Sequence, residues 1–334
     1  MGIVVSFCAF CQASFLSFLF AGSFNTNSQN VIWEYRLPDF SDDGYGKAVH
    51  HLFDVYERTS KRKLIPGEQG RVGLKVYSAS GLGLSTPKAL VLAVIQELEA
   101  RKFSRKDIFI IDEAAYNLRR SGFLPELSQG GDTFKGVKVY ALDQNRYWDD
   151  DWFYTSSIPS RSAISEFFVR GVFNREASER SYLPVPLILD ADFWINLPMV
   201  TSHETIGVCG AMANATIFNI SNNKRFIENR VHASVAIAEI AAIPEFQETW
   251  VFTLMTLERY QFIGGFMFNF RYTQTEPFLW LSTNANAMDY LMFQRINKAR
   301  AQERLRIFKN PPDFFEYAKS LDIGDYEDVR VVSL

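Results

Sequence analysis

Six histidine and acidic side chains have the chemistry of a metal site or a proton-transfer site. They are Asp112, Glu113, His203, Glu204, His232 and Asp289. Imidazole and carboxylate groups together can bind a divalent cation or exchange protons with a substrate. Their spacing contains no compact pattern such as His-Glu-x-x-His, so only the fold can bring them together. Structural hydrogen bonding is the alternative role for the same side chains.

A glycine-bearing loop over residues 78–86, SASGLGLST, lies between an expected strand and an expected helix. Free N–H groups at a helix start can bind a phosphate or carboxylate, and hydroxyl groups add donors. The loop lacks the Gly-Lys-Ser/Thr of a P-loop and is no dinucleotide fingerprint. A plain turn is the alternative, with Thr86 capping the helix and Pro87 at its first position. The candidate ligand-binding residues here are Ser80, Gly81, Gly83, Ser85 and Thr86.

The three cysteines suggest little cofactor chemistry. Cys8 and Cys11 lie in an apolar N-terminal segment, and Cys209 stands alone in Gly-Val-Cys-Gly. An iron–sulfur cluster needs about four cysteine ligands and is therefore not expected. Cys209 is either a nucleophile near His203 or, as is commoner, a buried and unreactive side chain.

Strand and helix patterns alternate along most of the chain. Apolar runs predict strands at residues 71–78, 107–112, 136–142, 187–198, 249–256 and 278–283, and helices at 87–102, 229–243 and 285–308. Such alternation predicts an α/β fold, with a mostly parallel or mixed sheet flanked by helices. The length fits one large domain or two coupled lobes.

Ligands of such folds usually bind beyond the carboxyl ends of the strands. That rule nominates three loops, at residues 78–85, 112–116 and 196–204. The third loop carries Asn196 and His203.

The segment around the third loop resembles a known family motif. Residues 191–217 read ADFWINLPMVTSHETIGVCGAMANATI. They are similar to the central motif of the domain-of-unknown-function 362 family, with matches at Asn196, Pro198, His203 and Asn214. Thr201 and Ala213 stand where that family carries lysines. The two neutral residues remove positive charge from the implied site.

Other segments resemble the same family, so that the likeness covers roughly residues 72–300. Lys75 is similar to a lysine of its early strand, Asp112 to the acid after its second strand, and His232 to a recurring histidine. STNANAMDY resembles a further motif, with Ser282, Ala287 and Asp289 matching. The resemblance implies ligand contacts by Asn196, Asn214 and His232, but no settled reaction. Many relatives carry a cysteine-rich cluster segment, which this chain lacks.

The N-terminal residues 3–21 are apolar or small, without lysine or arginine before Arg36. They predict a signal peptide over residues 1–23 and an exported or periplasmic protein. A membrane anchor is the alternative. We expect a lead-in at residues 24–70, the α/β domain at 71–309, and a C-terminal helix with an acidic tail at 310–334.

Charge and composition limit the expected partners. The 334 residues carry a formal net charge of −3, which gives no reason to expect a nucleic-acid partner. No second membrane-length apolar run follows the N-terminal segment. We therefore expect a protein that binds a small anionic or metal-bound ligand at the strand ends. If it is an enzyme, His203, Asp112 and Asp289 would transfer protons. A non-catalytic binding or interaction protein is the alternative, and cofactor, metal and oligomeric state stay open.

Overall fold

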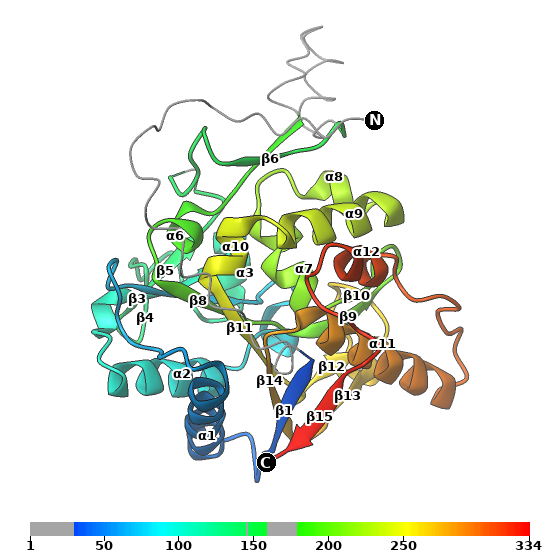
Figure 1. The fold of residues 1–334 in the computed structure, drawn as a ribbon, viewed down its shortest axis with the longest axis horizontal. Helices are drawn as coiled ribbons and strands as arrows, with labels where there is room; N and C mark the ends of the chain where they lie inside the picture. Colours follow the sequence, from blue (N-terminus) through cyan, green and yellow to red (C-terminus); the bar gives the residue numbers. More distant parts are fainter. Residues whose placement is uncertain (1–29, 145, 159–178) are drawn as a thin grey trace, which may run out of the picture.

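The computed structural model describes residues 30–144, 146–158 and 179–334, and a nine-stranded sheet runs through it (Figure 1). The strand order is β15-β1-β14-β11-β8-β2-β3-β5-β4. β14 and β4 run antiparallel to the other strands, so the sheet is mixed but mostly parallel. The predicted α/β class is confirmed. The strands are β1 (Val31–Arg36), β2 (Val72–Val76), β3 (Ile108–Asp112), β4 (Thr133–Phe134), β5 (Val137–Ala141), β8 (Phe193–Leu197), β11 (Trp250–Thr256), β14 (Phe278–Ser282) and β15 (Arg330–Ser333).

Helices cover both faces of this sheet (Figure 1). α1 (Asp42–Ser60) and α2 (Lys88–Ala100) pack on one face, while α7 (Ala211–Ala215), α9 (Arg230–Ala241), α11 (Ala285–Gln302) and α12 (Phe314–Ser320) pack on the other. In β3, Ile108 and Ile110 belong to the hydrophobic core on the face of α1 and α2. Phe109 and Ile111 belong to the core on the opposite face. A strand buried on both faces needs such a continuous apolar run, which explains why its sequence lacks polar alternation.

A smaller sheet stands beyond the carboxyl ends of β8 and β11. Its order is β10-β9-β12-β13, and its strands are β9 (Val200–His203), β10 (Gly207–Cys209), β12 (Tyr260–Gln261) and β13 (Thr273–Gln274). The chain passes from β8 into β9 and from β11 into β12, and β9 and β12 pair in parallel. This continuation brings the segments that follow two central strands together at one end of the large sheet.

Shorter elements complete the described chain. They are the hairpin of β6 (Phe153–Thr155) and β7 (Arg180–Tyr182), the helices α3 (Ala115–Arg120), α6 (Val185–Ile188), α8 (Lys224–Ile227) and α10 (Pro244–Thr249), and the 3-10 turns η1 (Gly81–Leu84), η2 (Arg105–Asp107), η3 (Ile217–Asn219) and η4 (Phe270–Tyr272).

Two predicted boundaries do not match the sheet. Within the expected lead-in of residues 24–70, β1 pairs antiparallel with β14, and α1 packs on the sheet. In the expected tail of residues 310–334, β15 pairs in parallel with β1. Both segments are thus parts of the main sheet. Their pairing partners lie far away in sequence, which a local pattern does not reveal.

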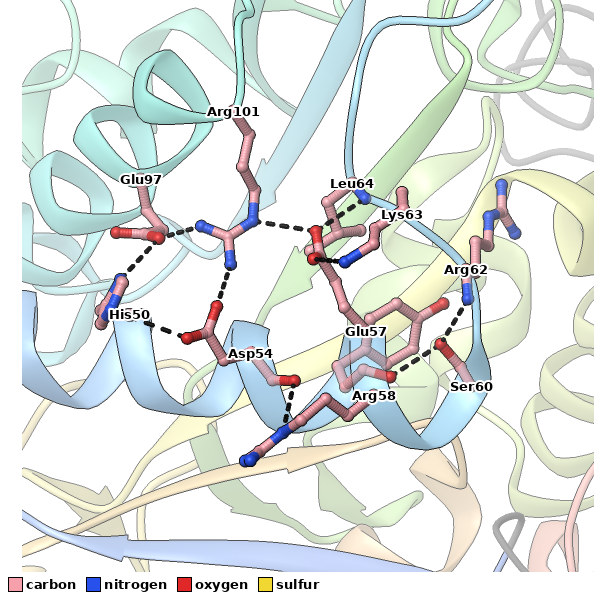
Figure 2. A network of polar contacts seen from close by, with 11 residues as sticks. His50, Asp54, Glu57, Arg58, Ser60, Arg62, Lys63, Leu64, Glu97 and Arg101 are labelled. Carbon is pink, nitrogen blue, oxygen red and sulfur yellow. Dashed lines mark hydrogen bonds and ion pairs between the residues drawn. The ribbon is translucent and has the colours of Figure 1, made fainter.

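Helices α1 and α2 are joined by a polar network on the surface (Figure 2). The Arg101 guanidinium is 2.7 Å from Asp54 and 3.0 Å from Glu57, and it also contacts Glu97. The His50 ring lies 2.9 Å from the Glu97 carboxylate. The network therefore links the surface-facing sides of the two helices by ion pairs.

The predicted signal segment lies outside the described residues. Among the helices that the structure describes, none is both long enough and apolar enough to cross a membrane.

Candidate functional site

A polar row crosses the centre of the large sheet near its carboxyl edge. Lys75 of β2 is in register with Asn196 of β8, and Asn196 is in register with Thr253 of β11. The side chains of Lys75 and Asn196 are fully buried, and that of Thr253 nearly so. Buried polar groups are tolerated when each finds a hydrogen-bond partner, so their partners decide what the row can do.

The Lys75 ammonium has three acceptors within reach. It lies 2.6 Å from Asp112 Oδ1, 3.1 Å from Asn214 Oδ1 and 3.0 Å from the Val76 carbonyl oxygen. An ammonium has three donors, so these contacts saturate it. The other Asp112 oxygen accepts a 2.5 Å hydrogen bond from the Ser78 hydroxyl. Lys75 and Asp112 therefore form a buried ion pair whose hydrogen bonds are satisfied inside the protein.

Asn196 and Asn214 extend this row to α7. Asn214 Nδ2 donates to Asn196 Oδ1 at 2.8 Å, and Asn196 Nδ2 donates to the Ala211 carbonyl oxygen at 2.8 Å. Asn196 Nδ2 also lies 3.1 Å from Thr253 Oγ1. The two asparagines that match the family motif are thus brought together, as expected, but their amides hold α7 against the sheet.

Asp289, the fifth residue of α11, caps the start of α7. Its two carboxylate oxygens accept from the N–H groups of Ala211 and Met212, at 2.6 and 2.9 Å. A Cβ on Gly210 would lie 2.2 Å from an Asp289 oxygen, so only glycine permits this approach. Burial raises the pKa of Asp289 to about 7, although the two N–H donors oppose that rise.

The two histidines occupy separate local environments. His203 Nδ1 accepts from the N–H groups of Thr205 and Ile206 at 3.3 Å each, and burial lowers its pKa. His232 lies in the first turn of α9, where its backbone N–H donates to the Asn229 side-chain oxygen. No hydrogen bond or ion pair among residues 30–144, 146–158 and 179–334 joins either ring to Asp112 or Asp289. Within the described part of the chain, hydrogen bonds and ion pairs therefore do not link the two histidines to Asp112 or Asp289, and a shared acid–base role stays a prediction.

The described residues contain no group of three His, Cys, Asp or Glu side chains arranged to hold a metal ion. The Cys209 thiol is buried, and burial together with Asp289 raises its pKa. A raised pKa keeps the thiol protonated and poorly nucleophilic. This environment fits the buried, unreactive alternative.

The two positions where the family carries lysines are enclosed. Thr201 and Ala213 are both fully buried, and Thr201 Oγ1 donates to the Gly265 carbonyl oxygen at 2.7 Å. Lys75 already places an ammonium beside Asn214. A second lysine would bring another charge into a site with little water to solvate it.

The glycine-bearing loop is a folded turn. Thr86 does not cap α2: its hydroxyl accepts from the Tyr77 N–H at 2.8 Å and donates to the Leu197 carbonyl oxygen at 2.7 Å. The Ser80 hydroxyl bonds the Tyr77 hydroxyl at 2.8 Å, and Gly81 takes a positive φ of 71° beside Arg120. Thr86 thus joins the ends of β2 and β8. Its hydroxyl bonds Tyr77 and Leu197 instead of a backbone N–H in the first turn of α2.

An open pocket of about 300 Å³ lies against this loop, at the first turn of α2. Two cationic side chains line it: exposed Lys88 and half-buried Arg259. The Arg259 guanidinium donates to the Gly83 carbonyl oxygen at 2.6 Å. Glu258 also lines the pocket and accepts from the Tyr45 hydroxyl at 2.8 Å. The remaining lining residues are Phe40, Leu82, Gly83, Ser85, Thr86, Pro87, Ala89, Ser121 and Met199.

Sequence reasoning placed Gly83, Ser85 and Thr86 here but missed Lys88 and Arg259. A signal existed for Arg259, because it is the third residue after β11, which is parallel to β8 and ends at the same edge of the sheet. Lys88 follows Pro87 at the helix start and was counted as part of the helix.

No protein-family model matches the chain, and no curated protein matches it. Among solved structures, it is similar to a crystal structure of a Thermotoga maritima protein determined by a structural genomics consortium. The TM-score is 0.40 and the sequence identity 7%. The match covers 79% of this chain and 59% of the other, so the chain spans less than two thirds of that protein.

Proposed function

We propose that the protein binds a small anionic group in the pocket at the first turn of α2. The observation that carries this proposal is the presence of two cations, Lys88 and Arg259, in the lining of one open pocket. An ammonium and a guanidinium together match a phosphate, sulfate or carboxylate group. The sequence prediction of an anion on the loop at residues 78–86 is kept, whereas Asn196, His203 and Asn214, which were expected to orient it, do not line this pocket.

The neighbouring groups support an anion over a cation. Ser85 contributes a hydroxyl group to the lining, whereas the buried Ser121 hydroxyl donates to the Ser78 carbonyl oxygen. The hydrogen bond from Arg259 to Gly83 leaves most of the five guanidinium donors for other acceptors. Glu258 opposes the positive charge, but with two cations present the three side chains sum to one positive charge.

Binding without catalysis is the favoured form of this activity. Two of the expected proton-transfer side chains are engaged elsewhere: Asp112 with Lys75 and Ser78, and Asp289 with two backbone N–H groups. A proton-transfer residue must reach a substrate atom within hydrogen-bond distance. Asp112, Asp289 and His203 do not line the pocket, and the carboxylate that does, Glu258, accepts a hydrogen bond from Tyr45. The alternative of a non-catalytic family member is therefore preferred, and the family resemblance itself remains a prediction.

Titration calorimetry with inorganic phosphate tests the proposal. We expect Lys88→Gln and Arg259→Gln each to weaken phosphate binding roughly tenfold, because each removes one charged hydrogen-bond donor. Lys106→Gln is the matched control, since exposed Lys106 precedes β3 at the opposite end of the sheet. Equal weakening by all three variants, or no phosphate binding by the wild type at millimolar concentration, would show the proposal to be wrong.

A further inference from the structure

Four large apolar side chains gather beside the pocket, and we name them the apolar rim. Leu82 is 70% exposed, Met267 80%, Phe268 37% and Phe270 71%. Leu82 comes from the β2–α2 loop, and the other three come from the segment between β12 and β13. Single exposed apolar residues are ordinary on protein surfaces, but a group of them marks an interaction site.

Direct contacts join the two segments into one surface. Gly83 packs so closely on the Phe268 ring that a Cβ there would lie 2.1 Å from a ring carbon. The Arg259 guanidinium lies 5.8 Å from the ring centroids of both Phe268 and Phe270. Because Arg259 also bonds the Gly83 carbonyl oxygen, it fixes the rim and the pocket relative to each other.

The cations of this surface lie among the apolar side chains. Lys88 and Arg259 line the pocket, and exposed Arg271 directly follows Phe270. The one acidic pocket residue, Glu258, accepts a hydrogen bond from Tyr45. Exposed apolar groups interspersed with arginine and lysine complement a surface that offers both hydrocarbon and negative charge.

We infer that the apolar rim docks on a membrane surface that contains anionic phospholipid, with a headgroup phosphate entering the pocket. This inference rests on the proposed function, since it assigns the source of the anion. A bilayer is favoured over a single soluble lipid because the rim projects outward. An isolated acyl chain would need an enclosed apolar cavity to shield it from water, whereas outward-facing side chains can enter the bilayer interface.

Co-sedimentation with vesicles tests the inference on the full chain. One set of vesicles is pure phosphatidylcholine. The other contains phosphatidylglycerol at a mole fraction of roughly 0.3, which gives a strong negative surface potential. We expect binding to the anionic vesicles only, and weaker binding as salt is raised. Arg271→Gln should weaken it roughly fivefold, as expected for one cation near an anionic surface.

Substitutions in the rim separate the two proposals. Met267→Ser and Phe270→Ser should each weaken vesicle binding roughly fivefold to tenfold, because less apolar surface enters the interface. Met267 does not line the pocket, and the rings over Arg259 are those of Phe268 and Phe270, so phosphate binding by Met267→Ser should stay at the wild-type value in calorimetry. Ile65→Ser is the control, since Ile65 is 48% exposed in the loop that enters the amino end of β2.

The outcomes are distinguishable. Wild-type protein that binds phosphate but no vesicles overturns the docking inference and leaves the proposed function intact. Failure of the wild type to bind phosphate in solution overturns the proposed function by itself. Equal binding to both vesicle types overturns the role of the anion in docking. Vesicle binding that Ile65→Ser weakens as much as Phe270→Ser overturns the assignment to the rim. Thermal unfolding of each variant checks that the fold is retained.

Discussion

Two polar networks of this protein use the same kinds of side chains in opposite surroundings. Around Lys75, the ion pair with Asp112 has side chains that are 0% and 6% exposed. Around Arg101, in Figure 2, the guanidinium is 11% exposed and its three carboxylates are 9% to 47% exposed, so water reaches this network, above all at Asp54. The Arg101 network contains more ion pairs, yet we expect it to contribute less to stability. Loss of a partner is costly only where water cannot take its place.

The pKa shifts of the two regions also run in opposite directions. Burial raises the pKa of Asp289, which lies beside α7 in the buried region. Burial acts in the same sense on Glu57, but hydrogen bonds from the Leu64 N–H, Lys63 and Arg101 outweigh it and leave the pKa lowered. The surroundings of Asp289 therefore favour its protonated carboxyl, while those of Glu57 favour the ionised form. The following changes test this contrast.

Removal of the buried ammonium should have the largest effect. We expect Lys75→Met to lower the free energy of unfolding by roughly 3–5 kcal/mol, because Asp112 would keep only Ser78 as a partner in a dry site. Urea denaturation measures the loss. Lys138→Met is the control: Lys138 pairs with Asp132 on the surface, where both side chains are 44% to 50% exposed, and its loss should be under about 1 kcal/mol. Similar losses in the two variants would contradict the contrast.

Titration of Asp289 should produce the next largest effect. Since its folded pKa of about 7 exceeds the value of about 3.9 in an unfolded chain, the folded state binds the proton more tightly. The stabilisation is complete below about pH 4 and is lost as the pH rises to 7, by about 3 kcal/mol. Urea denaturation at several pH values measures this slope.

The Asp289→Asn variant isolates the pH-dependent contribution of Asp289 to the free energy of unfolding, because an asparagine does not titrate. The difference in unfolding free energy between wild type and variant should change over the window from pH 4 to pH 7. A constant difference would show that the carboxyl is ionised throughout this range. Glu57 gives the opposite sign: its lowered pKa contributes stability above about pH 4.3 that is lost as the pH falls.

Loss of the surface guanidinium should have the smallest effect. We expect Arg101→Met to cost about 1–2 kcal/mol, since its three carboxylates regain water. The cost should shrink in 1 M NaCl, whereas the cost of Lys75→Met should not, because salt screens exposed charges. His50→Gln is the milder comparison, since its ring is 64% exposed. If the loss of unfolding free energy in Arg101→Met does not depend on salt, the Arg101 network behaves like the buried Lys75 network, and the contrast is wrong.

Much of the fold could be predicted because it rests on local patterns. An observed strand lies within each of the strands expected at residues 71–78, 107–112, 136–142, 249–256 and 278–283. An apolar run bounded by polar residues identifies a strand without knowledge of its distant partners. The helix expected at 285–308 ends at Gln302. The run at 187–198 includes the end of α6 as well as β8, because an apolar run alone does not separate a short helix from a strand.

The site was harder to predict because its residues have partners far away in sequence. The strand-end rule correctly brought Asp112 and Asn196 to one edge of the sheet, and Lys75 joins them there. It said nothing about whether they face solvent. His203 was expected to act with Asp112, but its ring accepts from the N–H groups of its own turn.

The sequence by itself determined the alternation of elements and the residues that follow each central strand, because both depend on side-chain periodicity over a few neighbouring positions. The tertiary structure alone decided which of those residues lie in a dry network and which line an open pocket. Lys75 and Lys88 are the same residue type in adjacent elements, yet one is fully buried and the other exposed. That difference arises from α7 and Asp112 closing over Lys75, while β11 delivers Arg259 to the pocket beside Lys88. Burial and electrostatic environment are set by contacts between distant segments, so they appear only when the chain is folded.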